Sequence, residues 1–332
     1  MSGVYISLVS ASVLASEGVV ETYASHPKTA EFAQLMSDKH GFDQDYIKNI
    51  LAKAEKKQSI IDAISRPAER TKAWFEYREI FLGEKRITQG VEFWNENADV
   101  LAKASEDYGV EPEIIVAIVG VETRYGSYMG SYRVVDALAT LGFDYPPRAK
   151  FFSGQLEELF LLAREQKQDP LSLKGSYAGA MGYGQFIPSS YRSFARDNTG
   201  DGFADIWNNK SDAIGSIANY FQEHGWQKGQ PVLERATLAY FHPDGFFNAR
   251  SRPKSTLSEY KSKGLTLRQA EVPEDTKAVA LRYQQQGKYE YWFGFNNFYA
   301  ITRYNRSRLY ARAVWELSQE IKQRREQYLS KS

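Results

Sequence analysis

The sequence of 332 residues contains no cysteine and only four histidines. Without cysteine the chain cannot form disulfides, thiolate zinc sites, iron–sulfur clusters or thiol nucleophiles, and no N-terminal cysteine is present to carry a lipid. The histidines, at positions 26, 40, 224 and 242, show no metal-ligand spacing. This pattern argues against a zinc enzyme and against a catalytic triad that depends on histidine.

The sequence also lacks an excess of charge and a long apolar run. Its 42 Lys and Arg residues balance 41 Asp and Glu residues, which leaves a formal net charge of +1. Proteins that bind nucleic acid or anionic lipid surfaces usually carry a clear positive excess, so we expect no nucleic-acid partner. No run beyond the N-terminal region is apolar enough to serve as a transmembrane segment. Hydrophobic residues at 42% and charged residues at 25% indicate a globular chain.

The N-terminal region has two interpretations. The first 16 residues carry no charge, and they end in a short apolar run followed by small residues. This composition resembles the apolar region and cleavage site of an export signal, although no Lys or Arg precedes it. Residues 1–24 are therefore interpreted either as the remnant of an export signal or as an N-terminal arm.

Cap residues and apolar spacing predict a mainly α chain of the α+β class with one small β region. Residues 28–108 show helix starts and glycine stops. The segments 278–283 and 289–293 alternate apolar and polar residues like strands, with a turn at Gly287 and Lys288. From residue 306 to 328 apolar side chains repeat every four residues, which predicts a long final helix.

An acidic side chain lies on the apolar stripe of the helix predicted at 111–126. Glu122 follows Ile115, Ile118 and Val119 at helical spacing, so its carboxyl group shares their face. Burial and the negative end of the helix dipole both disfavour a charged carboxylate, so we expect the pKa of Glu122 to rise from about 4.3 to about 6 to 7. A protonated Glu at neutral pH can act as a general acid. The alternative is an ion pair, with Arg124 or a more distant cation, that closes the helix end.

Residues 175–191 form an uncharged segment that combines glycines with aromatic side chains and Gln185. It does not match a phosphate-binding loop, because the third glycine and the following Lys-Ser/Thr pair are missing. Glycines let the backbone approach a ligand, aromatic faces stack on sugar rings, and an amide both donates and accepts hydrogen bonds. The segment therefore predicts a saccharide groove, with a glycine-rich helix-packing segment as the alternative.

An acidic segment at 197–205 places oxygen side chains at positions 1, 3, 5 and 9 of a calcium loop, with glycine at position 6. Asn208 stands where a glutamate would close the loop, so we expect Asp212, at the start of the next helix, to close it. The candidate ligands are Asp197, Thr199, Asp201, the carbonyl of Phe203, and Asp212. We expect structural Ca²⁺ here, with a turn rich in Asp and Asn as the alternative.

Six motifs that follow one another along the chain carry a resemblance to a known family. They are GVETRYG at 120–126, DALATLGFDYP at 136–146, YAGAMGYGQFIPSSY at 177–191, DNTGDG at 197–202, DAIGSIANYF at 212–221 and FYAITRYNRS at 298–307. From about residue 45 to 325 the chain resembles the lytic murein transglycosylase B family, glycoside hydrolase family 103. The resemblance implies a lysozyme-like core, a helical domain built from both chain ends, and a small inserted β domain. The implied ranges are 25–108 with 311–332 for the helical domain, 109–230 with 301–310 for the core and calcium loop, and 231–300 for the β domain.

The resemblance also implies the roles of individual residues. Glu122 is implied as the single catalytic acid/base, with Ser176 and Gln185 near the scissile bond. The other implied groove residues are Tyr220, Tyr304, Asn305 and Tyr310, with Tyr77 reaching in from the helical domain. Arg148 is implied as one of two arginines that contact the lactyl or peptide portion of the glycan, but Pro147 replaces the other arginine. Each tyrosine has the alternative role of a core residue.

The function that the resemblance implies is cleavage of the β-1,4 bond between N-acetylmuramic acid and N-acetylglucosamine, with formation of 1,6-anhydromuramoyl products. The implied location is the periplasm, and the implied partners are peptidoglycan glycan strands and cell-wall synthesis proteins. One alternative is a muramidase that uses water and needs a second carboxylate, for which Asp136, a predicted N-cap, and Asp144 are nearest in sequence. The other is a non-catalytic, calcium-stabilised protein that binds peptidoglycan.

Overall fold

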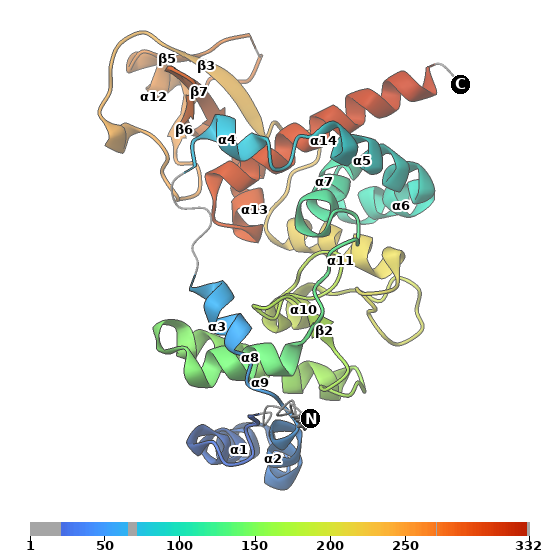
Figure 1. The fold of residues 1–332 in the computed structure, drawn as a ribbon. Coiled ribbons are helices and arrows are strands. Elements are labelled where there is room, and N and C mark those ends of the chain that lie inside the picture. Colours follow the sequence, from blue (N-terminus) through green and yellow to red (C-terminus); the bar gives the residue numbers. More distant parts are fainter. Residues whose placement is uncertain (1–20, 66–71, 270, 331–332) are drawn as a thin grey trace, which may run out of the picture. The chain divides into compact units, whose positions relative to one another are not determined.

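The computed structural model describes residues 21–65, 72–269 and 271–330 (Figure 1). The chain divides into two compact units, residues 1–56 and 57–332. Residues 1–20, which hold most of the predicted export signal or N-terminal arm, lie outside the described residues. Among the helices in the described ranges, none combines the length and apolarity that a bilayer crossing needs.

The smaller unit contains a pair of helices, α1 (Pro27–His40) and α2 (Gln44–Ala52). Helix α1 ends at Gly41, whose φ of 66° lies in the left-handed region that glycine adopts without strain. Asp43 then caps α2 by accepting a hydrogen bond from the backbone N–H of Asp45. The predicted glycine stop after the first helix is therefore confirmed.

The larger unit is built mainly of helices around a large apolar core, and a smaller apolar cluster lies in the five-stranded sheet region. These helices are α3 (Gln58–Ile64), α4 (Trp74–Arg78), α5 (Glu84–Glu96), α6 (Ala98–Tyr108), α7 (Pro112–Thr123), α8 (Val134–Asp144), α9 (Ala149–Glu165), α10 (Pro188–Phe194), α11 (Lys210–Glu223), α12 (Leu257–Ser262), α13 (Asn296–Tyr304) and α14 (Arg308–Leu329). Helix α7 lies in the centre, against α5, α6, α11 and α14. Its sequence is almost entirely apolar because it is enclosed on most sides.

The helical region predicted at 28–108 ends in two helices, α5 and α6, that meet at Asn97. The side-chain Nδ2 of Asn97 donates to the carbonyl of Phe93 over 2.7 Å. Asn97 is buried and its φ of −121° departs from helical geometry, so the chain changes direction there. Local side-chain bonding of this kind competes with helix continuation.

Two antiparallel sheets complete the larger unit. The small one pairs β1 (Tyr132–Arg133) with β2 (Lys174–Gly175). The five-stranded sheet has the order β4-β6-β7-β3-β5, from β3 (Leu233–Leu238), β4 (Ser255–Thr256), β5 (Leu265–Leu267), β6 (Lys277–Gln285) and β7 (Lys288–Gly294). Strands β6 and β7 confirm the two predicted strands, but the turn between them is formed by Gln286 and Gly287, one residue earlier than predicted, because Lys288 already pairs with Gln285. Gly287 has a φ of 68°.

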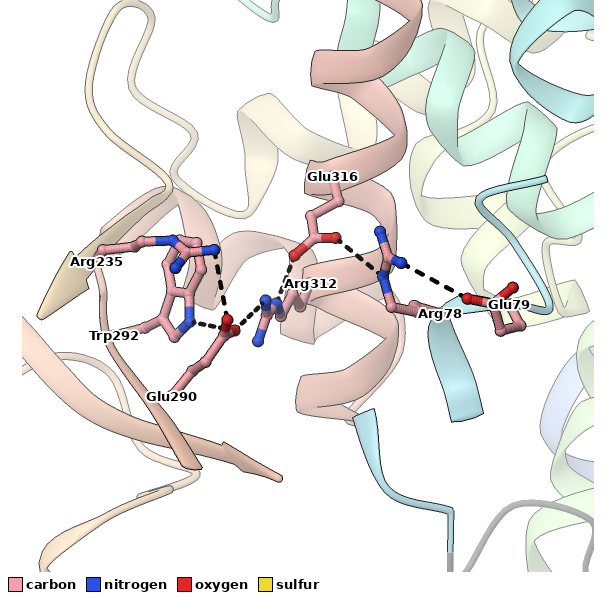
Figure 2. A network of polar contacts seen from close by, with 7 residues as sticks. All are labelled: Arg78, Glu79, Arg235, Glu290, Trp292, Arg312 and Glu316. Carbon is pink, nitrogen blue, oxygen red and sulfur yellow. Dashed lines mark hydrogen bonds and ion pairs between the residues drawn. The ribbon is translucent and has the colours of Figure 1, made fainter. Parts of the chain in front are cut away.

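A buried arginine joins the sheet to the last helix, as Figure 2 shows. Arg312 of α14 donates from Nη2 to Glu290 of β7 over 2.8 Å, and from Nε to Glu316 over 2.7 Å. The guanidinium carbon also lies 4.3 Å from the ring centroid of Trp74 and 4.5 Å from that of Tyr283. These contacts hold the first turns of α14 against α4 and the sheet.

Candidate active site

The predicted carboxylate lies in the last turn of α7. Ile115, Ile118 and Val119 are fully buried, which confirms the apolar stripe on which Glu122 was placed. Glu122 itself is half-buried. The helix ends one residue later, at Thr123, so the carboxyl group stands where the core meets the surface. The guanidinium Nε of Arg124 donates to Gln89 over 3.1 Å.

The hydroxyl of Tyr310 donates to Oε1 of Glu122 over 2.5 Å. Tyr310 lies in the first turn of α14, where Ser307 caps the helix by accepting the backbone N–H of Tyr310. Its side chain is 3% exposed. Burial, followed by the charge of Glu122, raises the pKa of the Tyr310 phenol well above its usual range. Tyr310 is therefore a neutral hydrogen-bond donor to the carboxylate.

Two further predicted tyrosines extend this cluster. Tyr304, the last residue of α13, donates from its hydroxyl to the carbonyl of Gly184 over 2.5 Å. Burial and the charge of Glu122 raise the pKa of Tyr304 well above its usual range. The Tyr220 ring meets the Tyr304 ring edge-on at 4.7 Å, and its hydroxyl donates to the carbonyl of Arg303 over 2.7 Å. Burial raises the pKa of Tyr220 to about 12.

The glycine-rich segment lies against these tyrosines and the end of α7. At Gly184, a Cβ atom would lie 2.8 Å from the Tyr304 hydroxyl oxygen, so only glycine allows this approach. Gln185 has a φ of 52°, and its Nε2 donates to the carbonyls of Met129 and Gly182 over 3.2 and 3.0 Å. The half-buried amide is thereby fixed in place, with its oxygen left as an acceptor for a ligand.

Three consecutive residues after α7 have positive φ: Arg124 at 50°, Tyr125 at 58° and Gly126 at 87°. The hydroxyl of Thr123 stabilises this turn, because it accepts the backbone N–H of Gly126 over 3.0 Å and lies 3.2 Å from the carbonyl of Tyr183. Such backbone strain is typical of functional sites. Thr123 was not predicted from the sequence, since its role depends on a partner 60 residues away.

The remaining predicted groove residues make local contacts. Tyr77 is buried in α4, 5.3 Å from Phe81 between ring centroids. Ser176 accepts backbone N–H groups of its own loop, and Asn305 accepts that of Ser307 at the end of α13. These bonds shape the backbone around the tyrosines.

Arg148 lies apart, in the short 3-10 helix η1 (Pro146–Arg148) before α9. Its exposed guanidinium covers the ring of Phe151 at 4.4 Å and that of Phe152 at 4.9 Å. A charge that is stacked on an aromatic face but open to solvent can still contact an anionic group.

The acidic loop brings together the carboxylates of Asp197 and Asp212. The hydroxyl of Thr199 lies 3.3 Å from Oδ1 of Asp197 and 3.5 Å from Oδ1 of Asp212. Asp212 is fully buried, and burial is the main reason that its pKa is raised, with the charge of Asp197 adding to it. Asp201 accepts the backbone N–H of Phe203. Within the described residues, no three His, Asp or Glu side chains are arranged as a metal site.

The half-buried Glu122 accepts a hydrogen bond from the buried Tyr310 at the end of α7, which makes it a candidate acid/base. Residues 24–319 match the family model described as the transglycosylase SLT domain. The chain belongs to this family, and it is an enzyme of the lytic transglycosylase class that acts on peptidoglycan.

The chain is 45% identical over 309 residues to membrane-bound lytic murein transglycosylase B of Escherichia coli (strain K12), covering 90% of this chain and 84% of that protein. The crystal structure of catenated SltB1 from Pseudomonas aeruginosa matches with a TM-score of 0.87 and 50% identity, over 91% of this chain and 99% of that one. SLT35 of Escherichia coli, solved in complex with calcium and with bulgecin A, matches with a TM-score of 0.83 and 44% identity, over 93% and 98%. These matches confirm the predicted family, the enzyme class and the mainly α fold with a lysozyme-like core.

Proposed function

We propose that Glu122 is the catalytic acid/base of this lytic transglycosylase. In this proposal the enzyme cleaves the β-1,4 bond between N-acetylmuramic acid and N-acetylglucosamine, and it forms 1,6-anhydromuramoyl products. The observation that carries the proposal is the hydrogen bond from Tyr310 to Glu122, because it fixes one carboxylate at the end of a buried helix and beside the glycine-rich segment.

In the first step, protonated Glu122 gives its proton to the glycosidic oxygen as the bond to C1 breaks. The positive charge that develops on the sugar ring is stabilised by nearby dipoles. The amide oxygen of Gln185 is one such dipole, since its Nε2 is already engaged with two backbone carbonyls. Tyr304 is half-buried and can offer its ring to a sugar, whereas Tyr77, Tyr220 and Tyr310 are buried and support the site from within the core.

In the second step, Glu122 as a carboxylate takes the proton of the muramoyl 6-hydroxyl, whose oxygen attacks C1. An intramolecular hydroxyl is favoured over water because it is already held near C1. Asp136, one of the two acids nearest to Glu122 in sequence, is engaged in an ion pair with Arg133 over 2.8 Å. Asp136 lies inside the first turn of α8 and is not the N-cap, which is Arg133, so that prediction was wrong.

The experiment that tests this reaction is mass spectrometry of digested peptidoglycan. The 1,6-anhydro products should be about 18 Da lighter than the products of a muramidase, because no water is added. Products that carry new reducing ends would contradict the proposal and favour the muramidase. Absence of turnover by folded protein on purified sacculi would favour the non-catalytic binding protein.

We also propose that the acidic loop binds Ca²⁺ through Asp197, Thr199, Asp201, the carbonyl of Phe203, and Asp212. The donors are all oxygen atoms, which Ca²⁺ prefers. The buried Asp212 carboxylate beside Asp197 supports this assignment, since a divalent cation would offset their repulsion. The ion would stabilise the loop that precedes α11, which carries Tyr220, and it would take no part in the chemistry.

The proposed substrate places the enzyme in the cell envelope, where peptidoglycan lies, and we propose the periplasm as its location. Glycan strands are the proposed binding partners of the groove. Cell-wall synthesis proteins remain proposed partners through the substrate that they share with this enzyme.

A further inference from the structure

A cavity of about 300 Å³ lies at the opposite end of α7 from Glu122. Its lining comes from the start of α7, from residues 226–234 between α11 and the first turns of β3, and from the middle of α14. Glu113, in the first turn of α7, belongs to this lining. At 1.5 Å per residue, Glu113 and Glu122 lie about 14 Å apart along the helix axis. The cavity is therefore separate from the site around Glu122.

One face of α14 forms an aromatic and polar wall of the cavity. Trp315, Gln319 and Lys322 all line it, and they follow one another at helical spacing, so they share one side of the helix. The half-buried ring of Trp315 meets the ring of Trp292 edge-on at 5.6 Å, which holds the indole in place. Gln319 and Lys322 are exposed, so solvent reaches this wall. A fixed indole beside polar side chains suits the stacking of a sugar ring.

Two carboxylates of the cavity are already compensated within the protein. Glu111 accepts Nε1 of Trp226 over 2.7 Å and the backbone N–H of Gly229 over 2.6 Å. Glu113 accepts Nζ of Lys322 over 2.8 Å. Because these charges have their donors, a cation is not needed to stabilise them. The cavity therefore favours a neutral polar ligand.

Donors and acceptors remain for such a ligand. The ammonium of Lys322 has three donors, and the ion pair uses one of them. The Nε2 of Gln319 donates within α14, which leaves the amide oxygen as an acceptor. The exposed side-chain amide of Gln230 forms no hydrogen bond with a described residue. Burial raises the pKa of the third acid, Glu234, which shifts this carboxyl toward a neutral form that can both donate and accept.

We propose that this cavity is a second saccharide site, which binds a short N-acetylated segment of a glycan strand. Trp315 stacks on a sugar ring, while the amides and the ammonium bind its hydroxyl and acetamido groups. The inference rests on the glycan substrate of the proposed function, but it does not depend on which residue is the catalytic acid. A strand that is held at both the groove and the cavity leaves the enzyme more slowly than one held at the groove alone.

A titration tests the site without turnover. The probe is N,N′-diacetylchitobiose, and the readout is the indole N–H resonance of Trp315, assigned by its loss in Trp315→Phe. The cavity variant is Gln230→Ala with Gln319→Ala; its control is Gln323→Ala with Gln327→Ala, exposed positions of α14 outside the cavity. We expect a saturable shift of the resonance in the wild type and the control that is lost in the cavity variant. No shift, or an equal shift with cellobiose or with n-butylamine, would overturn the assignment to an N-acetylated saccharide.

Turnover on two substrates tests what the site does for the enzyme. Sacculi offer long strands, whereas a soluble tetrasaccharide of the glycan is too short to fill the groove and reach the cavity as well. We expect kcat/KM of the cavity variant to fall about fivefold on sacculi and less than twofold on the tetrasaccharide, with the control unchanged on both. Equal losses on the two substrates, or no loss on sacculi, would overturn the proposal. Absence of 1,6-anhydro products from the wild type would contradict only the proposed function.

Discussion

Replacing Tyr310 with Phe removes one hydroxyl and leaves the ring that packs at the start of α14. In the wild type that hydroxyl donates to Glu122 over 2.5 Å from a side chain that is 3% exposed. A hydrogen bond to a charged group contributes about 1.5 to 3 kcal/mol, and one pKa unit corresponds to about 1.36 kcal/mol. Without this bond the carboxylate form of Glu122 is less stable by about 1.5 to 3 kcal/mol. Glu122 should therefore ionise about 1 to 2 pH units higher than in the wild type.

The sign of the effect follows from the first catalytic step. Glu122 must be protonated to act as an acid, so activity declines when the pH rises far enough to ionise it. A donor to the carboxylate favours the ionised form, and removing the donor lets the protonated form persist to higher pH. The alkaline limb of the profile of kcat/KM against pH should therefore move about 1 to 2 units upward in Tyr310→Phe.

Tyr304→Phe is the matched control, because the Tyr304 hydroxyl donates to the carbonyl of Gly184. It removes a hydroxyl from the same cluster without removing a donor to the carboxylate. The assay is release of soluble muropeptides from sacculi between pH 4 and about 9, a range that spans the usual Glu and His values. An unshifted alkaline limb in Tyr310→Phe, or the same shift in both variants, would refute the assignment of Glu122 as the acid.

The remaining predictions concern the carboxylate, the loop and the exposed arginine. Glu122→Gln keeps the size of the side chain but cannot deliver a proton, so turnover should fall about 10³-fold or more while the thermal unfolding midpoint is unchanged. If this variant kept more than a tenth of the wild-type rate, Glu122 would not be the catalytic acid. A hundredfold excess of Ca²⁺ over its Kd should stabilise the wild type by about 2.7 kcal/mol and Asp201→Ala by far less, and equal melting with Ca²⁺ and with chelator would identify a simple turn. Arg148→Ala should weaken cleavage of peptide-bearing glycan more than that of peptide-free glycan, whereas equal losses would mean that the side chain only packs on Phe151.

Features with a local cause could be predicted from the sequence. The hairpin of β6 and β7 follows from alternating side chains and from Gly287, which supplies the positive φ of the turn. The apolar stripe of α7 follows from helical spacing and placed Glu122 correctly at the edge of the core. In both cases the deciding interactions lie within a few residues of each other.

Features that depend on distant partners could not be predicted in the same way. Tyr310 lies 188 residues from Glu122, and only the family resemblance nominated it, because no periodicity connects the two positions. The run of positive φ at Arg124 and Tyr125 is held by Thr123 and the glycine-rich segment, and ordinary residues there give no local signal for it. The acidic loop at 197–205 has a sequence pattern, yet the burial of Asp212 comes from the packing of α11.

The role of Arg312 can be seen only in the folded structure, where it contacts Glu290 and Glu316 (Figure 2). From the sequence alone, Arg312 is expected to be a polar, solvent-facing position of the last helix. In the structure its side chain is 1% exposed and lies between the rings of Trp74 and Tyr283. Burial is the largest single influence on the pKa of Glu290 and would raise it, but the hydrogen bonds from Arg312 and Gln285, together with the charges of Arg312 and Arg235, lower the pKa below its usual value. The pair therefore stabilises the fold above the usual Glu pKa, and this contribution is lost as the pH falls through the lowered value.

Arg312→Met keeps the bulk of the side chain but leaves Glu290 and Glu316 without their main cation. Removing one partner of a buried pair costs about 3 to 5 kcal/mol, because the other charge stays buried. We expect that loss in the free energy of unfolding by urea at pH 7, and a smaller loss near pH 4. Adding Glu290→Gln to Arg312→Met should recover part of the lost free energy of unfolding, because burying a neutral amide costs less free energy than burying a carboxylate without a counter-ion. If the double variant were no more stable than Arg312→Met alone, the aromatic packing of the guanidinium, and not its charge, would be what joins α14 to the sheet.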